Sequence, residues 1–290
     1  MSRTRLWAVI GLLVLFATAF VAAGCGDDDD DDDGGTETTA AGGGEDFGLI
    51  NEGTLFIGVD TPYPPFEQGQ PPNVTGYDID VLNAIAEGLG LETEYQDTGF
   101  ATIFRDVAAG QFDTAAAAST IKPGREKEVD FTDPYYASAT ALVVEEGSDI
   151  ASVDDLSGTI VGAQDGTVQE DYANAESGAA EVRGFPEGTN AISSVLTGAV
   201  DAALIDEAVA ADTIEKQGGL EIAETFQAAD APDLFGFAVA PQNDALREAM
   251  NEQLATLKED GTLAEAYNEW FGTEPPPEVL EGTNELLTND

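Results

Sequence analysis

Short apolar segments alternate with amphipathic stretches through most of the chain. Residues 54–60, TLFIGVD, predict a strand that ends in the proline-rich loop TPYPPFE. Residues 77–90, YDIDVLNAIAEGLG, predict a helix, because apolar side chains recur at helical spacing and a glycine stands near the end. Strands that alternate with helices are typical of an α/β fold.

The same order of elements begins again in the second half of the chain. AAGQFDTAAA (108–117) and LTGAVDAALI (196–205) share a helix end, a glycine, an apolar residue, an aspartate and a small apolar strand. Two such copies predict two similarly built lobes rather than one continuous sheet. The expected boundaries are 49–142 plus 236–272 for the first lobe, 143–235 for the second lobe and 273–290 for a loosely ordered C-terminal tail.

The N-terminus has the pattern of an exported protein. MSRTR precedes an apolar run that ends in Ala22-Ala23-Gly24-Cys25, which resembles a bacterial lipoprotein signal. That resemblance implies removal of residues 1–24 and lipidation of Cys25. The alternative is a membrane-spanning helix, since about 18 apolar residues approach the minimum span.

Residues 25–48 are acidic and almost without apolar side chains, so we expect a disordered tether after the lipidated cysteine. The seven consecutive aspartates at 27–33 are interpreted as a solvated spacer rather than a calcium site, because adjacent like charges repel and extend.

Charge and composition exclude several classes of function. The chain has 57 Asp and Glu against 10 Lys and Arg, a formal net charge of −47, which argues against nucleic acid as a partner. It has no histidine and one cysteine, which excludes histidine-based acid–base catalysis and an internal disulfide. We therefore expect no cofactor and no metal ion.

Six segments in order carry a resemblance to a known family. They are GVDTPYPPFE, GYDIDVLNAIAEGLG, AGQFDTAAAASTIKPGREKEVDFTDPYY, IVGAQDGT, GAVDAALIDE and DGTLAEAYNEWFG. Together, over roughly residues 50–272, they resemble the family 3 solute-binding proteins of polar amino acid ABC transporters. The resemblance implies a periplasmic-binding-protein-like (type II) fold, in which two lobes joined by two hinge strands close on one free amino acid. It also implies delivery to an ABC permease, from the outer face of the cell membrane or the periplasm.

The resemblance assigns the carboxylate of the ligand to one arginine. Arg125, in STIKPGR, matches the family's carboxylate-binding position, and a guanidinium can hold a carboxylate through two parallel hydrogen bonds. Thr120 matches a second carboxylate contact, and Ala118 and Ser119 lie on the strip that offers backbone groups to the ligand. The alternative for Arg125 is an exposed loop cation paired with a neighbouring glutamate. The nearby Lys122 is interpreted as exposed and solubilising.

In the second lobe, GAQDGTVQE predicts a helix start. Thr167 and Glu170 form a capping-box pattern, and the resemblance gives this turn a grip on the same carboxylate. Val168 departs from the family, whose members frequently have a second Thr or Ser there, so we expect only its backbone N–H to contribute. Asp206, in ALIDE, matches the acceptor of the ligand's α-ammonium group. The alternative for Asp206 is an N-cap of the following helix.

Three further residues match the remaining walls of the family's site. Tyr63 and Phe100 match aromatic walls, and Asp60 matches a position that contacts the distal end of the ligand. An acid there weakly favours a glutamine-like or basic amino acid. Two alternatives share the fold: a cyclohexadienyl-dehydratase-like enzyme, with a general acid in the cleft, and the ligand-sensing domain of a signalling system.

Overall fold

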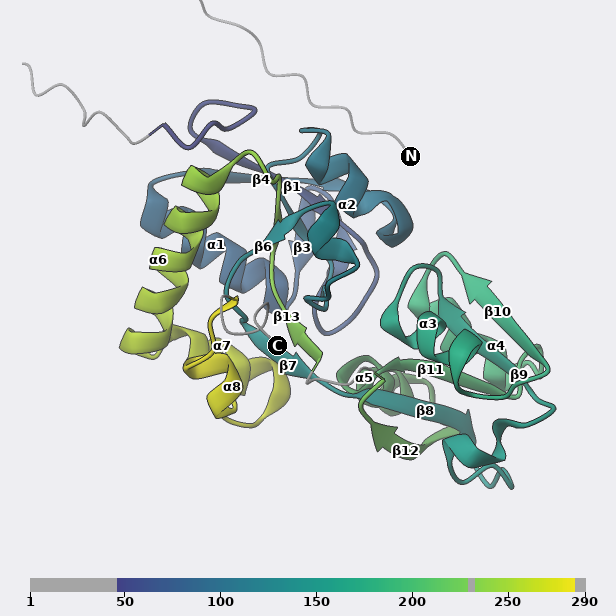
Figure 1. Ribbon diagram of the computed structural model, residues 1–290. Coiled ribbons are helices and arrows are strands. Elements are labelled where there is room, and N and C mark those ends of the chain that lie inside the picture. The colour runs from purple at the N-terminus through teal and green to yellow at the C-terminus, as the bar shows by residue number, and fades with distance from the viewer. Residues whose placement is uncertain (1–45, 229–232, 285–290) are drawn as a thin grey trace, which may run out of the picture. The chain divides into compact units, whose positions relative to one another are not determined.

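Two five-stranded sheets form the centres of two lobes in the computed structural model, which describes residues 46–228 and 233–284 (Figure 1). Both sheets belong to one compact unit, residues 45–290. Across the described ranges, no helix is both long and apolar enough to cross a lipid bilayer. The predicted signal peptide, Cys25 and all but the last residues of the tether lie outside the described part.

The first sheet has the strand order β4-β1-β5-β14-β6. Its strands are β1 (Thr54–Val59), β4 (Glu92–Asp97), β5 (Thr114–Ala116), β6 (Asp130–Phe131) and β14 (Ala238–Val239). Strand β1 runs parallel to β4 and β5, whereas β14 runs antiparallel to β5 and β6. The strand predicted from TLFIGVD is therefore confirmed as β1, and its alternate side chains Leu55, Ile57 and Val59 are fully buried.

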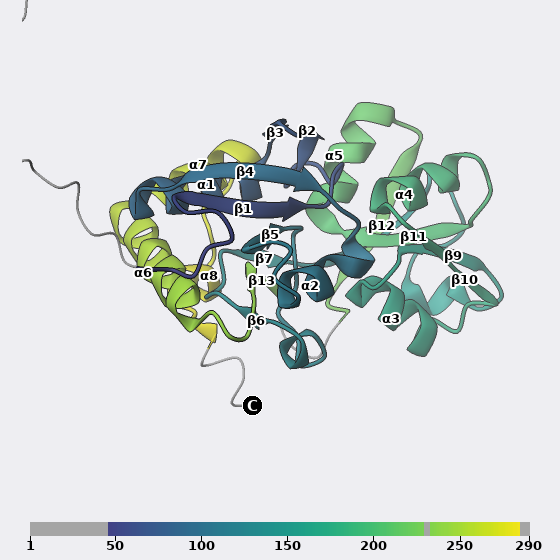
Figure 2. The ribbon, with the colours of Figure 1, turned by 90° about the horizontal axis from the view of Figure 1, so that it is seen from above.

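The helices of the first lobe pack around this sheet (Figures 1 and 2). They are α1 (Tyr77–Leu89), α2 (Phe100–Ala108), the short 3₁₀ helix η1 (Arg125–Lys127), α6 (Asp244–Asp260), α7 (Thr262–Phe271) and α8 (Pro277–Leu280). A small hairpin, β2 (Gln68–Gln70) with β3 (Asn73–Thr75), precedes α1. Helix α1 is the predicted amphipathic helix, and it ends at Gly90, whose φ of +72° suits a residue without Cβ.

The second sheet has the strand order β10-β9-β11-β8-β12. Its strands are β8 (Thr140–Glu145), β9 (Ile160–Gln164), β10 (Glu181–Phe185), β11 (Ala202–Asp206) and β12 (Leu220–Phe226). Its helices are the 3₁₀ helix η2 (Val153–Leu156), α3 (Val168–Ala175), α4 (Gly188–Leu196) and α5 (Glu207–Gln217). Helix α4 packs on β9 and β11, and α5 packs on β12.

The internal repeat in the sequence has a structural counterpart. The strand of the first copy is β5, which is third in its sheet and parallel to β1; the strand of the second copy is β11, which is third in its sheet and parallel to β9. The two segments therefore occupy equivalent places in two similarly built lobes. Each ends at the carboxyl edge of its sheet, where ligands of α/β folds bind.

The chain passes between the lobes next to a two-stranded sheet. Strand β7 (Tyr136–Ser138) pairs antiparallel with β13 (Asp233–Phe235), and only Ala139 separates β7 from β8. The change of sheet thus occurs about three residues before the boundary expected after residue 142, because β7 and β8 read in the sequence as one apolar run. Strand β13, expected in the second lobe, pairs with β7 instead.

The segment after α7 differs from the loosely ordered tail expected from residue 273. Helix α8 buries Val279 completely, and Asn284 bonds back to the body: its backbone N donates to Asp133 Oδ1 at 2.9 Å and its Nδ2 to the Phe131 carbonyl at 3.1 Å. The proline-rich composition suggested loose order, but one buried valine and these hydrogen bonds fix the segment as far as residue 284.

Candidate ligand-binding site

Side chains of both lobes enclose a small cavity of about 10 Å³, which is room for about one water molecule. Its walls contain every residue predicted to bind the ligand except Ser119. The first lobe contributes Asp60, Tyr63, Phe100, Ala117, Ala118, Thr120 and Arg125, and the second lobe contributes Gln164, Thr167, Val168, Gln169 and Asp206. Ser119 is buried elsewhere, and its hydroxyl donates to the Ala117 carbonyl at 3.2 Å.

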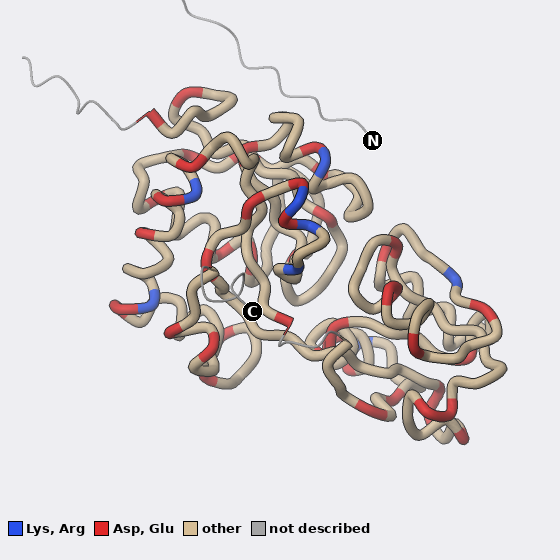
Figure 3. Tube along the Cα trace, viewed as in Figure 1, with Lys and Arg blue, Asp and Glu red and all other residues tan. Residues whose placement is uncertain are grey.

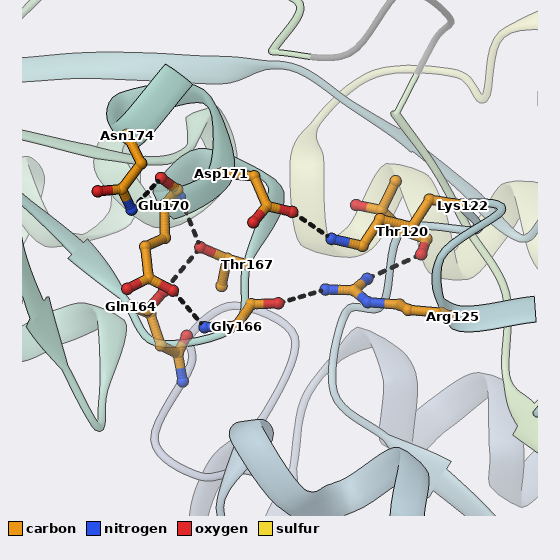
Figure 4. Close-up of polar contacts among 9 residues, drawn as sticks. All are labelled: Thr120, Lys122, Arg125, Gln164, Gly166, Thr167, Glu170, Asp171 and Asn174. Atoms are coloured by element: carbon orange, nitrogen blue, oxygen red, sulfur yellow. Dashed lines mark hydrogen bonds and ion pairs between the residues drawn. The ribbon is translucent and has the colours of Figure 1, made fainter. Parts of the chain in front are cut away.

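Arg125 is held rigidly at the start of η1. It is 7% exposed, and its guanidinium donates to the Thr120 carbonyl at 2.8 Å and, across to the other lobe, to the Gly166 carbonyl at 3.2 Å (Figure 4). The guanidinium also lies 4.9 Å from the Phe100 ring centroid and 4.7 Å from that of Phe104, within cation–π range. Burial lowers the pKa of Arg125 to about 10, so it stays charged at neutral pH. The alternative of an exposed loop cation is wrong.

The turn before α3 confirms only half of the predicted capping box. Thr167 Oγ1 accepts a hydrogen bond from the Glu170 backbone N at 3.1 Å, as predicted, and donates to the Gln164 carbonyl at 2.8 Å (Figure 4). The Glu170 carboxylate, however, accepts from the Gly166 N at 2.7 Å rather than from the N of Thr167. The Thr167 N donates to the Gln164 carbonyl at 3.4 Å instead. Helix α3 then starts at Val168, in the cavity wall.

Asp206 ends β11 and is 4% exposed. Its carboxylate accepts hydrogen bonds from Tyr63 Oη at 2.5 Å, Ser138 Oγ at 2.7 Å and Gln169 Nε2 at 3.2 Å. The pKa of Asp206 is raised by burial, and these hydrogen bonds and Arg125 offset that rise only in part. Asp206 stands at the N-cap position of α5, but its side chain makes no hydrogen bond to the first turn of that helix. The interpretation of its carboxylate as a helix cap is therefore wrong.

Asp60 stands at the end of β1 and also crosses between the lobes. Its carboxylate accepts from Gln164 Nε2 at 2.8 Å and from the Phe100 backbone N at 3.3 Å. Burial raises the pKa of Asp60 to about 6, a change that the Gln164 hydrogen bond partly offsets. The cavity therefore has one permanent cation and two carboxylates in its walls.

Comparison with known proteins identifies the chain. The bacterial extracellular solute-binding proteins, family 3, match its residues 55–273. The chain belongs to this family. The predicted resemblance is thereby confirmed, and the family's extracellular location agrees with the predicted extracytoplasmic one.

Two solved structures and one relative show the extent of the likeness. The family 3 chain is 30% identical over 236 residues to an L-cystine-binding protein of Escherichia coli strain K12, covering 79% of this chain and 88% of the relative. It is similar, with a TM-score of 0.71 and 34% identity, to an ancestral arginine-binding protein bound to arginine, over 76% of this chain and 99% of the other. It is also similar, with a TM-score of 0.70 and 32% identity, to an ancestral amino acid-binding protein described as a precursor of cyclohexadienyl dehydratase. That likeness covers 76% of this chain and 96% of the other. These likenesses confirm the predicted two-lobe type II fold.

Sequence reasoning missed two amides of this family 3 site. Gln164 and Gln169 lie on either side of Thr167 and bond to Asp60 and Asp206, respectively. Both stand in the segment GAQDGTVQE, and the signal was present: Gln164 is a polar residue at the end of a buried strand, and Gln169 is a buried polar residue in the first turn of α3. A buried amide needs a partner, and each finds one carboxylate.

Lys122, the other cation of STIKPGR, does not have the exposed position expected of it. Its Nζ lies 2.7 Å from Asp171 Oδ2 of α3, and the lysine side chain is only 23% exposed (Figure 4). The family 3 chain has few basic residues among many acids in both lobes (Figure 3). Lys122 was expected to be solubilising, but it joins the first lobe to the second beside Arg125. The contact was invisible in the sequence because the partners are 49 residues apart.

Proposed function

We propose that this family 3 protein captures a free amino acid between its lobes and delivers it to an ABC importer. The observation that carries the proposal is the pair of buried opposite charges in one cavity wall, Arg125 from the first lobe and Asp206 from the second. An amino acid is a zwitterion, so its carboxylate matches the guanidinium and its ammonium group matches the carboxylate. Arg125 and Asp206 come from different lobes, so a ligand held by both is bound only when the lobes close.

The contacts that now join the lobes define what a ligand must replace. Tyr63 Oη bonds to Asp206, and the Arg125 guanidinium bonds to the Gly166 carbonyl. A ligand carboxylate would take the guanidinium from Gly166, and a ligand ammonium would join Tyr63 and Ser138 on Asp206. The first exchange replaces a guanidinium–carbonyl hydrogen bond with one between two opposite charges, and the second adds a cationic donor to the Asp206 carboxylate, so both favour the bound form.

The decisive experiment is a calorimetric titration of the protein with the common amino acids, after a thermal-shift screen. A ligand that binds the folded state raises its apparent stability in proportion to ligand excess over Kd. Binding of at least one polar amino acid with a stoichiometry of about one supports the proposal. The absence of any shift or heat with all of them contradicts it.

Asp60 favours ligands with an amide or a cation at the distal end. Its carboxylate and the Gln164 amide face the same cavity as Arg125, so they can accept from and donate to a side chain held there. The arginine bound to the ancestral structure agrees with this class. We therefore propose a basic or glutamine-like amino acid as the ligand, and we expect glutamate to bind more weakly because its distal carboxylate would meet Asp60.

Arginine affinity is expected to rise with pH through the titration of Asp60. The pKa of Asp60 in the ligand-free protein is about 6. About nine-tenths of the Asp60 side chains are therefore protonated at pH 5, and about nine-tenths are ionised at pH 7. Binding of a cationic side chain should thus strengthen about tenfold from pH 5 to pH 7. Calorimetry at both pH values checks this. Asp60→Asn should flatten the profile and weaken arginine more than glutamine, whereas the exposed control Glu92→Gln, at the far end of β4, should leave the profile unchanged.

The relationship to a dehydratase precursor raises an enzyme as the second candidate. Glu207, the acid beside Asp206, is exposed, and its carboxylate accepts from Thr225 Oγ1 at 3.4 Å outside the cavity wall. A general acid for elimination would therefore have to be Asp206 or Asp60, both of which have roles in holding a ligand. We propose a binding protein without turnover. Formation of product from prephenate or arogenate would overturn that.

We further propose that the mature protein is a lipoprotein on the outer face of the membrane. The supporting observation is the sequence Ala22-Ala23-Gly24-Cys25 at the end of the apolar run. Two acyl chains on Cys25 would suffice for stable anchoring, and residues 26–48 would set the reach of the tether. Mass spectrometry of the N-terminal peptide from the native host tests for the lipid. A sensor role would share every binding residue and would differ in its membrane partner.

A further inference from the structure

Two carboxyl groups are buried against each other directly behind the cavity. Glu67, at the end of the loop TPYPPFE, and Asp78, in the first turn of α1, are each fully buried. Three of their four carboxyl oxygens, Glu67 Oε1 and Oε2 and Asp78 Oδ1, are buried and find no donor among the described residues. The two side chains interact with each other, and a proton on one of the two carboxyl groups would supply the missing donor. Neither residue lines the cavity, so the amino acid site itself does not explain the pair.

The surroundings determine which of the two carboxyl groups carries the proton. Asp78 Oδ2 accepts from Tyr135 Oη at 2.7 Å and from the Ala118 backbone N at 3.0 Å, and the positive end of α1 favours an anion at this position. Burial and the nearby charge of Asp78 raise the pKa of Glu67 well above its ordinary value. Of the two, Glu67 is thus the better placed to carry a proton, and Asp78 to accept its hydrogen bond.

Asp78 holds the backbone of the cavity wall. Ala118 has a φ of +41°, in the left-handed region that residues with a Cβ rarely adopt, so its backbone is strained. Its N–H donates to Asp78, and the strip from Ala117 to Thr120 then supplies cavity wall and the carbonyl that receives Arg125. The position of the arginine clamp therefore depends on an acceptor that lies outside the site.

Glu67 is tied to the opposite wall. Its backbone N donates to the Tyr63 carbonyl at 3.1 Å, and the Tyr63 N donates to the Glu67 carbonyl at 2.9 Å. The Tyr63 ring reaches Asp206 from that bridge. A proton between Glu67 and Asp78 would thus link the segment that presents Tyr63 with the segment that presents Ala118, and through them the two charges proposed to bind a zwitterion.

We propose that Glu67 and Asp78 are positioning residues that share one proton, and that this proton holds the Ala118 backbone and the Tyr63 loop in the geometry that binds ligand. The inference rests on the proposed amino acid site only for its effect on affinity. The ionisable groups that face the pair are Asp60 from β1, Tyr63 from the loop, Tyr77 from α1 and Tyr135 before β7. Loss of the proton would place a second charge among these acids.

The sign of the pH dependence follows from linkage. The raised pKa of Glu67 means that the folded state keeps a proton which the unfolded state loses above its ordinary pKa of about 4.5. The stabilisation is complete below that value and is lost as pH rises toward the folded-state pKa. In Glu67→Gln the amide NH₂ donates to Asp78 at every pH, so this loss is absent.

The experiment compares the wild-type protein, Glu67→Gln and the exposed α1 control Glu87→Gln by urea unfolding from pH 5 to pH 9. The ratio of folding constants, wild type over Glu67→Gln, is expected to fall about tenfold per pH unit over the window in which the folded state alone holds the proton. Glu87→Gln should run parallel to wild type. An infrared difference spectrum should show a protonated carboxyl band in wild type that Glu67→Gln lacks. Parallel pH profiles for Glu67→Gln and wild type, or no such band, overturn the shared proton.

Titrations with arginine as the probe test the positioning role. Wild-type affinity is expected to fall at alkaline pH relative to Glu67→Gln, and Asp78→Asn should weaken binding at least tenfold. Adding Ala118→Gly, which relieves the left-handed strain, should recover part of that loss. Equal affinities of all variants at every pH would overturn the role. If wild type binds no amino acid at all, the proposed function fails, while the unfolding and infrared results still decide whether the proton is shared.

Discussion

Arg125→Ala is expected to weaken amino acid binding by about 100-fold or more. Two charge-assisted hydrogen bonds to a carboxylate in a buried site contribute about 3 kcal/mol or more together, and each 1.4 kcal/mol is a factor of ten in Kd. The affinity of Arg125→Lys should lie between those of wild type and Arg125→Ala, because an ammonium group keeps the charge but lacks the planar pair of donors. Calorimetry with the amino acid that binds wild type most tightly measures the effect.

The same substitution should change the stability of the ligand-free protein far less. The guanidinium loses its hydrogen bonds to Thr120 and Gly166, but a buried cation whose pKa is already lowered to about 10 is also removed. These two effects oppose each other, so we expect the melting temperature of the ligand-free protein to change by only a few degrees. Arg105→Ala removes an exposed arginine of the same lobe and should affect neither property. A Kd for Arg125→Ala within threefold of wild type would contradict the carboxylate assignment.

Asp206→Asn is expected to weaken binding by about 100-fold, through the ammonium end of the ligand. The substitution keeps the shape of the side chain and removes the charge that would pair with the ammonium group. The amide NH₂ would also point toward Ser138 or Gln169, which now donate to the carboxylate. Loss of a charged partner in a buried pair typically costs 2–5 kcal/mol.

Ligand analogues separate this effect from general damage. A desamino analogue of the ligand should bind wild type and Asp206→Asn equally weakly, because it has no ammonium group to lose. Glu207→Gln, a neutralisation at the adjacent exposed residue, is the matched control and should bind as wild type does. If Asp206→Asn discriminates against the desamino analogue as strongly as wild type does, the ammonium assignment is wrong.

The fold was predictable because it rests on local patterns. The strand before TPYPPFE and the helix after it appear in the spacing of their apolar residues, and the repeated glycine–apolar–aspartate segment indicated two equivalent lobes. The position of the crossing was not predictable, since Ala139 alone separates β7 from β8 and nothing in the sequence marks it. The order of the tail was missed because it depends on one buried valine, Val279, and on the hydrogen bonds of Asn284.

The site was predictable where motif and chemistry coincide. Arg125, Thr167 and Asp206 stand in recognisable segments, and each reaches the cavity. Ser119 does not, because its hydroxyl turns back to the Ala117 carbonyl. The Glu67–Asp78 pair could not be found in the sequence, because two acids eleven residues apart show no sign that they meet. Only the fold brings the loop against the first turn of α1.

The ion pair between Lys122 and Asp171 has a consequence for the ionic strength at which the lobes close. Acidic residues outnumber basic ones in both lobes, so the lobes repel each other over long distances (Figure 3). Dissolved salt screens that repulsion beyond a Debye length of about 8–10 Å at 0.1–0.15 M, and it also weakens the exposed Asp171 end of the ion pair. It screens the adjacent, more buried contact of Arg125 with the Gly166 carbonyl much less. Added salt would thus remove the force that holds the lobes apart and leave most of the contact that joins them. Capture of a ligand would then improve, rather than fail, in brine.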